Sequence, residues 1–179
     1  MQLNLMLTYL GQSHTVVNSQ PSEIDVTDVV SDSSKVTSGA MFVAIKGFSV
    51  DGHDFIPDAV SRGAQVVMVQ KQVAVPDDVT LVVVENTREG LSAMAGAFYD
   101  FPAAKMTMVG ITGTNGKTTT ANLCASMLEA AGNNVGVIST IDWRYNGQTH
   151  ASSMTTPDAV ELQKGLAQMY AAGVTHVVM

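Results

Sequence analysis

The segment 106–120, MTMVGITGTNGKTTT, constrains the fold of this chain more than any other part of its sequence. The short apolar run 106–109 predicts a buried strand, and the glycine-containing turn after it leads into a helical pattern. A strand, a glycine-containing turn and a helix that starts with Gly-Lys-Thr form the architecture of a phosphate-binding loop. We expect the apolar side of this helix to consist of Leu123, Met127 and Leu128.

Each residue type in this turn has a role in binding phosphate. Glycines let backbone N–H groups point inward around phosphate oxygens, and the helix presents its positive end to the anion. Lys117 can reach the β- and γ-phosphates as the catalytic cation, and the hydroxyl of Thr118 is placed to ligate Mg²⁺. We expect the nucleotide contacts to come from Gly113, Thr114, Asn115, Gly116, Lys117, Thr118 and Thr119.

The spacing of this loop differs from the common one. Ile111 stands where the first glycine is usual, with Gly110 and Gly113 on either side of it. The alternative interpretation is an ordinary turn at the start of a helix, which needs none of this chemistry. The strand before the turn and the helix after it favour the nucleotide site.

The composition excludes several other classes of protein. The chain has 179 residues, of which 46% are hydrophobic and 14% charged, so it can bury a core and is not disordered. No run approaches the roughly 18 apolar residues of a membrane span, and residues 1–10 lack the basic flank of a signal peptide. The single Cys124 excludes a disulfide framework and a zinc cluster. We therefore expect a cytoplasmic monomer that has no membrane partner.

The net charge of −7 is unevenly distributed. Residues 1–104 carry five basic and twelve acidic side chains, whereas residues 105–179 carry four of each. Neither part has a basic stripe, which argues against a nucleic-acid partner. An anionic ligand must therefore be bound locally, by backbone N–H groups and Lys117.

Residues 1–104 predict a small α/β domain. Asn86 and Glu89 have the spacing of a capping box at the start of a helix, and Pro102 indicates a domain boundary at about 102–105. The periodicity predicts helices over 3–10, 55–62 and 87–98, and strands over 25–30, 41–45, 66–69 and 81–84.

Residues 105–179 predict the first part of a parallel, three-layer α/β domain, because strands alternate with helices after the loop. The run 135–138 reads as a buried strand, and Asn146-Gly147 predicts a hairpin turn after a strand over 141–145. Trp143 in that strand is expected to pack on the sheet. Thr156 as N-cap and Pro157 as first residue predict a further helix.

The loop GITGTNGKTT resembles the ATP loop of the Mur ligases, which show the same departure from the common spacing. Residues 1–104 are similar to the members that add the third amino acid, L-lysine or meso-diaminopimelate, to UDP-N-acetylmuramoyl-L-Ala-D-Glu (UDP-MurNAc-L-Ala-D-Glu). This similarity rests on Asp32-Ser33, Gly39, 42–44, Gly47, 50–57, Gly63-Ala64, 91–93 and 98–99.

The resemblance implies a uridine-diphosphate site in residues 1–104, with contacts from Ser31 and Ser33 and from Phe48, Ser49 and Val50. The simpler interpretations are an ordinary polar turn for the two serines and surface packing for Phe48.

Two further features of the resemblance concern single positions. It implies that Thr155 and Thr156 contact the muramoyl substrate beside the γ-phosphate, although a plain helix cap would also explain them. Ser34 stands where the family has an arginine, and Lys35 is the neighbouring cation that could compensate.

The resemblance implies an ATP- and Mg²⁺-dependent amide ligase, whose substrate carboxylate is activated as an acyl phosphate before the diamino acid attacks. In the family, further metal ligands and a C-terminal domain follow the strand at 177–179. We therefore expect this chain to be an N-terminal fragment, inactive by itself. The alternatives are another Mur ligase, a ligase similar to folylpolyglutamate synthetase, or a non-catalytic module that binds the nucleotide-sugar.

Overall fold

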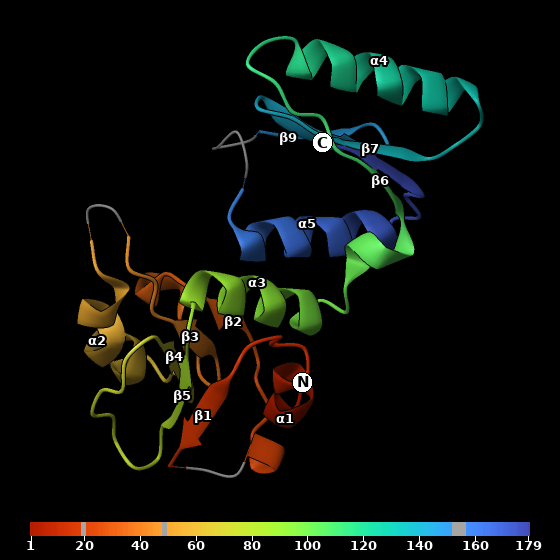
Figure 1. Cartoon of the computed structure of the whole chain (residues 1–179). Coiled ribbons are helices and arrows are strands. Elements are labelled where there is room, and N and C mark those ends of the chain that lie inside the picture. The colour runs from red at the N-terminus through yellow and green to blue at the C-terminus, as the bar shows by residue number, and fades with distance from the viewer. Residues whose placement is uncertain (19–20, 48–49, 152–156) are drawn as a thin grey trace. The chain divides into compact units, whose positions relative to one another are not determined.

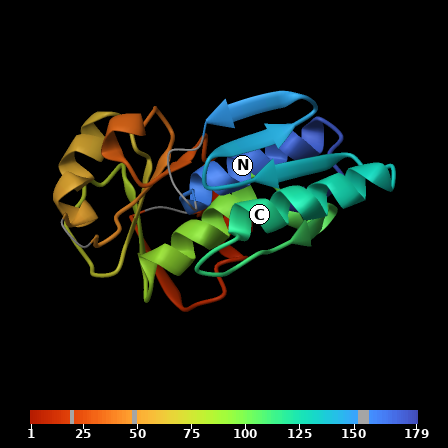
Figure 2. The ribbon, with the colours of Figure 1, turned by 90° about the horizontal axis from the view of Figure 1, so that it is seen from above.

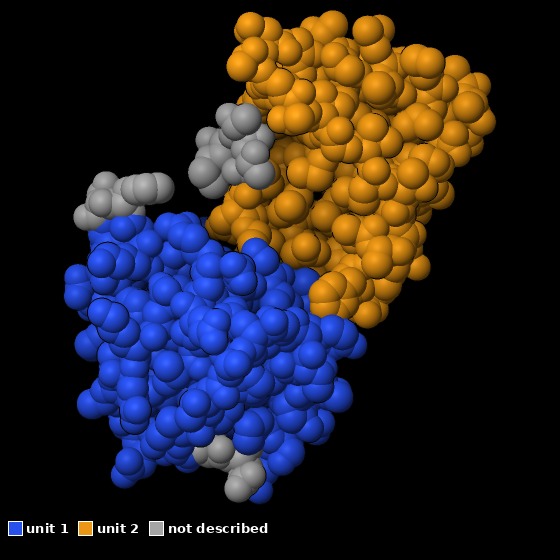
Figure 3. Space-filling model, viewed as in Figure 1, with its two compact units in different colours: residues 1–98 blue, residues 99–179 orange. Residues whose placement is uncertain are grey.

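A computed structural model describes residues 1–18, 21–47, 50–151 and 157–179. It divides into two compact units, Met1–Phe98 and Tyr99–Met179, shown in two colours in Figure 3. The division falls a few residues before the proposed boundary at 102–105. Within the described residues, no helix combines the length and the apolar character that crossing a bilayer requires.

Unit 1 contains a five-stranded sheet of order β1-β5-β4-β3-β2. Strands β2 to β5 are parallel, and β1 pairs with β5 in the antiparallel sense at one edge. The strands are β1 (His14–Val17), β2 (Val29–Val30), β3 (Met41–Val43), β4 (Val66–Val69) and β5 (Thr80–Val84).

Continuous apolar runs produce this sheet because both of its faces are covered. Phe42, Val67 and Leu81 face one side and pack with helix α2 (Ile56–Ser61). Met68 faces the other side and lies against Gly90 of helix α3 (Thr87–Phe98). Helix α1 (Leu3–Leu7) packs against α3, so the unit has helices on both faces of the sheet (Figure 1).

The predicted elements of unit 1 exist, but several are shorter than expected. The helix at 3–10 ends at Leu7, and the strand at 25–30 is reduced to Val29–Val30. The helix predicted over 55–62 is present as Ile56–Ser61, and a 3₁₀ turn, Gly52–Phe55, precedes it. Strand β1 was not predicted, because its first two residues are exposed, its last two are half-buried, and it lacks the alternation of a sheet face.

Asn86 caps α3 as predicted, but the reciprocal bond of a capping box is absent, because the Asn86 N–H donates to Gln12 Oε1 at 2.8 Å and not to Glu89. The side-chain oxygen of Asn86 accepts hydrogen bonds from the backbone N–H groups of Arg88 (2.9 Å) and Glu89 (3.4 Å). Its amide nitrogen donates to the Glu89 carboxylate at 2.8 Å. These bonds satisfy N–H groups that have no partner inside the helix, as a capping residue should.

Unit 2 contains a second five-stranded sheet of order β6-β10-β7-β8-β9. Strands β6, β10 and β7 are parallel, whereas the hairpin β8–β9 extends the sheet in the antiparallel sense. The expected parallel sheet is therefore mixed, because the hairpin adds its strands at the edge. The strands are β6 (Thr107–Val109), β7 (Val135–Ile138), β8 (Asp142–Tyr145), β9 (Gln148–Ala151) and β10 (His176–Val178).

The three layers of unit 2 follow from the alternation of side chains along β10, which lies between β6 and β7. Val178 packs under helix α4 (Lys117–Ala130), while Val177 packs on the other face with helix α5 (Ala159–Ala171). Figure 1 shows these helices on opposite faces of the sheet, and the turned view in Figure 2 shows α4 alongside β7. The α/β class with helices on both faces is confirmed.

Two predictions about these helices are wrong. Leu123 and Met127 are 62% and 73% exposed, because α4 approaches the sheet through the small side chains of Ala121 and Ala125 instead. Helix α5 is capped by Asp158 and not by Thr156, since the Asp158 carboxylate accepts the Glu161 N–H at 2.8 Å.

The hairpin turn agrees with its sequence. Asn146 and Gly147 have φ values of 48° and 73°, as the favoured two-residue turn requires. Trp143 in β8 packs into the α5 side of the sheet. A Cβ atom on Gly165 would overlap its ring, so this glycine allows α5 to approach the hairpin closely.

We predict that Gly165→Ala destabilises the chain by about 1–3 kcal/mol, because an added methyl group at a filled contact forces strain. This loss exceeds the gain of about 1 kcal/mol in helix propensity from alanine. The free energy of unfolding in urea measures the effect, with the exposed Lys164→Ala on the same helix as control. An unchanged midpoint for Gly165→Ala would contradict this packing.

Candidate functional site

The glycine-containing turn connects the end of β6 to the start of α4. Gly116 is the N-cap of α4 and has a φ of 79°, a left-handed conformation that side chains with a Cβ rarely adopt. A Cβ at Gly116 would meet no atom within 4 Å, so the space beside the turn is open. The local sequence therefore produces a sharp entry into the helix with an unfilled concave side.

The backbone N–H groups of this turn are available to a ligand. Ile111 donates to Met179 O at 2.6 Å, and the next donor to reach a backbone carbonyl is Thr120, which bonds Gly116 O at 2.9 Å. The N–H groups of residues 112–119 have no backbone acceptor among the described residues. A run of free N–H groups at a helix N-terminus fits the oxygens of a phosphate group.

Lys117 lies across the turn. Its ammonium group donates to the carbonyl of Gly113 at 2.7 Å, so the side chain folds back over the turn that precedes it. The ammonium group therefore lies beside the backbone of the turn. Nucleotide binding would exchange one backbone acceptor for charged ones, which form stronger hydrogen bonds.

A pocket of about 440 Å³ opens beside this turn, at the carboxyl ends of β6, β10 and β7. Ligands commonly bind at this edge of a parallel sheet. Of the predicted nucleotide contacts, Lys117 and Thr118 line the pocket, whereas Gly113, Thr114, Asn115, Gly116 and Thr119 form the turn or the helix start beside it. The full lining consists of Gly110, Ile111, Thr112, Lys117, Thr118, Ile138, Ser139, Thr140 and Met179.

The turn after β7 brings residues to this pocket that sequence reasoning missed. The Ser139 hydroxyl accepts the N–H groups of Ile141 and Asp142 at 3.1 Å each, which fixes the turn. Thr140 is thereby placed with its hydroxyl 3.3 Å from that of Thr118. The sequence signal that could have predicted these pocket residues is the presence of small polar residues directly after a buried parallel strand.

The residues present fit a magnesium ion bound together with a nucleotide. Among the described residues, no three His, Cys, Asp or Glu side chains gather into a metal-binding group. The pocket is lined by the hydroxyl residues Thr112, Thr118, Ser139 and Thr140, of which Thr118 is in the first turn of α4. Mg²⁺ commonly takes few protein ligands and completes its shell with phosphate oxygens and water, and one hydroxyl suits that arrangement.

Unit 1 has a second pocket, of about 270 Å³, after the carboxyl ends of β2 and β3. It brings together three of the predicted substrate contacts, Ser31, Ser33 and Val50. Phe48, Ser49, Thr155 and Thr156, also predicted as substrate contacts, lie outside the described residues. The lining consists of Ser31, Asp32, Ser33, Phe42, Ile45, Val50, Gly52 and Phe55.

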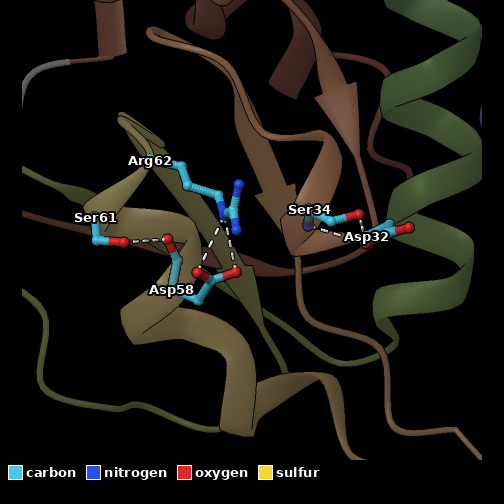
Figure 4. Close-up of polar contacts among 5 residues, drawn as sticks. All are labelled: Asp32, Ser34, Asp58, Ser61 and Arg62. Atoms are coloured by element: carbon cyan, nitrogen blue, oxygen red, sulfur yellow. Dashed lines mark hydrogen bonds and ion pairs between the residues drawn. The ribbon is translucent and has the colours of Figure 1, made fainter.

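Two carboxylates make hydrogen bonds in this part of unit 1 (Figure 4): Asp32, which lines the pocket, and Asp58 of α2, which does not. Asp32 accepts from the backbone N–H of Ser34 at 2.9 Å and from its hydroxyl at 2.7 Å. Both oxygens of Asp58 accept from Nε of Arg62 at 3.0 Å. Ser34, which replaces the arginine expected from the resemblance, thus fixes the Asp32 side chain.

These contacts favour the charged forms of both carboxylates. The hydrogen bond from the Ser33 hydroxyl lowers the pKa of Asp58 below 3.8, and the Arg62 bond lowers it further. The side-chain and backbone hydrogen bonds from Ser34 lower the pKa of Asp32 in the same way. Both groups therefore remain ionised at neutral pH, and Asp58 links the serine turn after β2 to helix α2 through its bond from Ser33.

We predict that Asp58→Asn lowers the unfolding temperature at pH 7 and that the difference from the original chain shrinks as the pH falls below about 4. A carboxylate with a lowered native pKa stabilises the fold above its unfolded pKa and loses this contribution as the pH falls through its native pKa. Thermal unfolding between pH 2.5 and 7 measures this, with the exposed Asp77→Asn as control. A difference that is independent of pH would contradict the assignment.

Comparison with known proteins places both units in one family. The domain described as "Mur ligase family, catalytic domain" matches residues 25–99, and the "Mur ligase middle domain" matches residues 111–179. A UDP-N-acetylmuramoyl-L-alanyl-D-glutamate–2,6-diaminopimelate ligase from Clostridium perfringens is 42% identical over 94% of this chain and 35% of its own length. The ligase of the same name from Bacillus cereus is 37% identical over 100% of this chain and 35% of its own length.

Solved structures show the same fold. A structure of a 2,6-diaminopimelate ligase with the same full name matches with a TM-score of 0.74 at 22% identity, over 90% of this chain and 33% of that one. The MurF ligase from Thermotoga maritima, solved in complex with ADP, matches with a TM-score of 0.56 at 27% identity, over 84% of this chain and 31% of that one. The chain spans about a third of the length of these relatives. Since two matched domains cover most of its length, the chain belongs to the Mur ligase family.

Proposed function

We propose that this chain is part of an ATP-dependent ligase that joins 2,6-diaminopimelate to UDP-MurNAc-L-Ala-D-Glu, the third amino-acid addition to the peptidoglycan precursor. The observation that carries the proposal is the match to relatives of that name over 88–100% of the chain, which includes both pockets. The names of these relatives favour diaminopimelate over L-lysine as the added amino acid.

The pocket of unit 2 would bind ATP. The free N–H groups of residues 112–119 would surround the β- and γ-phosphates, and Lys117 would exchange Gly113 O for a phosphate oxygen. The hydroxyl of Thr118 would hold Mg²⁺, whose charge offsets that of the transferring phosphoryl group. That a Mur ligase with a similar structure was solved with ADP supports this assignment.

Phosphoryl transfer explains why such a reaction needs ATP. A carboxylate is a poor acyl donor, because its leaving group would be oxide. The γ-phosphoryl group would pass to the D-glutamyl carboxylate and give an acyl phosphate, from which the attacking amine displaces phosphate. At the first step, this chain would position the γ-phosphate and neutralise its charge through Lys117, as in other phosphoryl-transfer enzymes.

The pocket of unit 1 would bind the uridine diphosphate end of the substrate. Ser31, Ser33 and Val50 line it, and Phe48 and Ser49 are assigned to the same site from the sequence. Thr155 and Thr156 are assigned to the muramoyl part of the substrate from the sequence, and both lie outside the described residues. The use of ATP and a nucleotide-sugar fits the cytoplasm, as does the free Cys124.

A non-catalytic module that only binds the nucleotide-sugar is the main alternative, and the two pockets distinguish the cases. A module that only binds the nucleotide-sugar in unit 1 would not need a phosphate-binding turn in unit 2. The free N–H groups and Lys117 therefore favour the ligase.

We predict that UDP-MurNAc-L-Ala-D-Glu raises the unfolding temperature of this chain. A ligand at 100 times its Kd stabilises the folded state by about 2.7 kcal/mol. Differential scanning calorimetry measures the shift, with UDP-glucose as a ligand that lacks the muramoyl peptide. Ser31→Ala combined with Ser33→Ala should remove most of the shift. An equal shift in that variant would place the ligand elsewhere.

We predict that Lys117→Ala weakens ATP binding by roughly 10- to 100-fold, because a hydrogen bond to a charged group contributes about 1.5–3 kcal/mol. Its free energy of unfolding should change by no more than about 1 kcal/mol, since the bond to Gly113 is exposed. Titration calorimetry and urea unfolding of the same protein measure both values, with Lys164→Ala as control. The reverse pattern, a large loss of stability with unchanged ATP affinity, would identify a structural lysine in an ordinary turn.

A further inference from the structure

Arg88 occupies a position that its own helix does not favour. It is in the first turn of α3, where a positive charge opposes the helix dipole. The cap does not require its side chain, because the Asn86 side chain already accepts the N–H groups of Arg88 and Glu89. A charged residue that weakens its own helix usually has another function.

The side chain of Arg88 reaches a distant part of unit 1. Its Nη2 donates to the carbonyl of Lys46 at 3.1 Å, across 42 positions of sequence. Lys46 belongs to a pair of short arms, 45–47 and 50–52. The arms are joined by Gly52 N to Ile45 O and by Gly47 N to Val50 O, each at 2.9 Å.

These arms form one wall of the unit 1 pocket. Ile45, Val50 and Gly52 line it opposite the serine turn that follows β2, whereas Arg88 does not line it. The arms have little apolar support, since Lys46 and Gly47 are exposed and Val50 is 57% exposed. Among the described residues, the Arg88 bond is the one side-chain hydrogen bond that ties the arms to α3.

We propose that Arg88 is a positioning residue: by fixing the carbonyl of Lys46, it keeps the arms 45–47 and 50–52 in the conformation that closes the wall of the unit 1 pocket. Through these arms it sets the affinity for the nucleotide-sugar. The role of Arg88 in affinity rests on the proposed function, whereas its effect on the arms concerns the ligand-free chain alone.

Arg88→Met keeps the length of the side chain and removes its donors, and Arg88→Lys keeps the charge and one donor group. Lys71→Met, an exposed charge elsewhere in unit 1, is the matched control. Amide hydrogen exchange at Gly47 and Gly52 reports on the arms, and the amide of Val67 in the core reports on the whole unit. Titration calorimetry with UDP-MurNAc-L-Ala-D-Glu gives the affinity.

In Arg88→Met we expect exchange at Gly47 and Gly52 to become about 3- to 10-fold faster and the affinity to fall by a similar factor, as the loss of one hydrogen bond permits. Val67 should be unaffected, Arg88→Lys should lie in between, and Lys71→Met should match the original chain. This combination would support the proposal.

Unchanged exchange at the two glycines would overturn the proposal, as would equally faster exchange at Val67, which would show general destabilisation. Faster exchange at the glycines with unchanged affinity would overturn the link to the pocket while leaving the proposed function intact. An original chain that does not bind the nucleotide-sugar would overturn the proposed function, and with it the role of Arg88 in affinity.

Discussion

Burial of short apolar strands on both of their faces is the constraint on which the rest of this structure depends. β4 and β7 are four residues long and buried along their whole length, so helices must cover both sides of each sheet. Parallel strands need long crossover connections, and α2 provides one between β3 and β4, α4 one between β6 and β7, and α5 one that leads to β10. The carboxyl ends of parallel strands lie at one edge of their sheet. In each unit, the turns that form the pocket lie at that edge of its own sheet.

The features that could be predicted from the sequence are those that neighbouring residues determine. Strands 66–69 and 135–138, the Asn86 cap and the Asn146-Gly147 turn each depend on residues within one short segment. The turn before α4 is of the same kind, because its glycine, lysine and helix start are consecutive. Local chemistry therefore allowed the α/β class and the glycine-containing turn beside the unit 2 pocket to be predicted.

The errors arose where distant residues decide the outcome. The strand character of β1 comes from its pairing with β5, and Leu123 and Met127 face outward because alanines make the contact with the sheet. Thr140 reaches the pocket only because β7 and α4 are adjacent in the fold. Periodicity within one segment contains no information about such neighbours, so these features appeared only with the tertiary structure.

The two units share one departure from local preference. Lys117 is the first residue of α4 and Arg88 the second of α3, so each helix begins with a cation that opposes its dipole. Each side chain also donates to a backbone carbonyl of a loop beside a pocket, Gly113 in one unit and Lys46 in the other. An acidic residue would stabilise either helix start better, but it could donate no such bond. At both helix starts, a cation that is unfavourable for the helix thus forms a hydrogen bond to a loop beside a pocket.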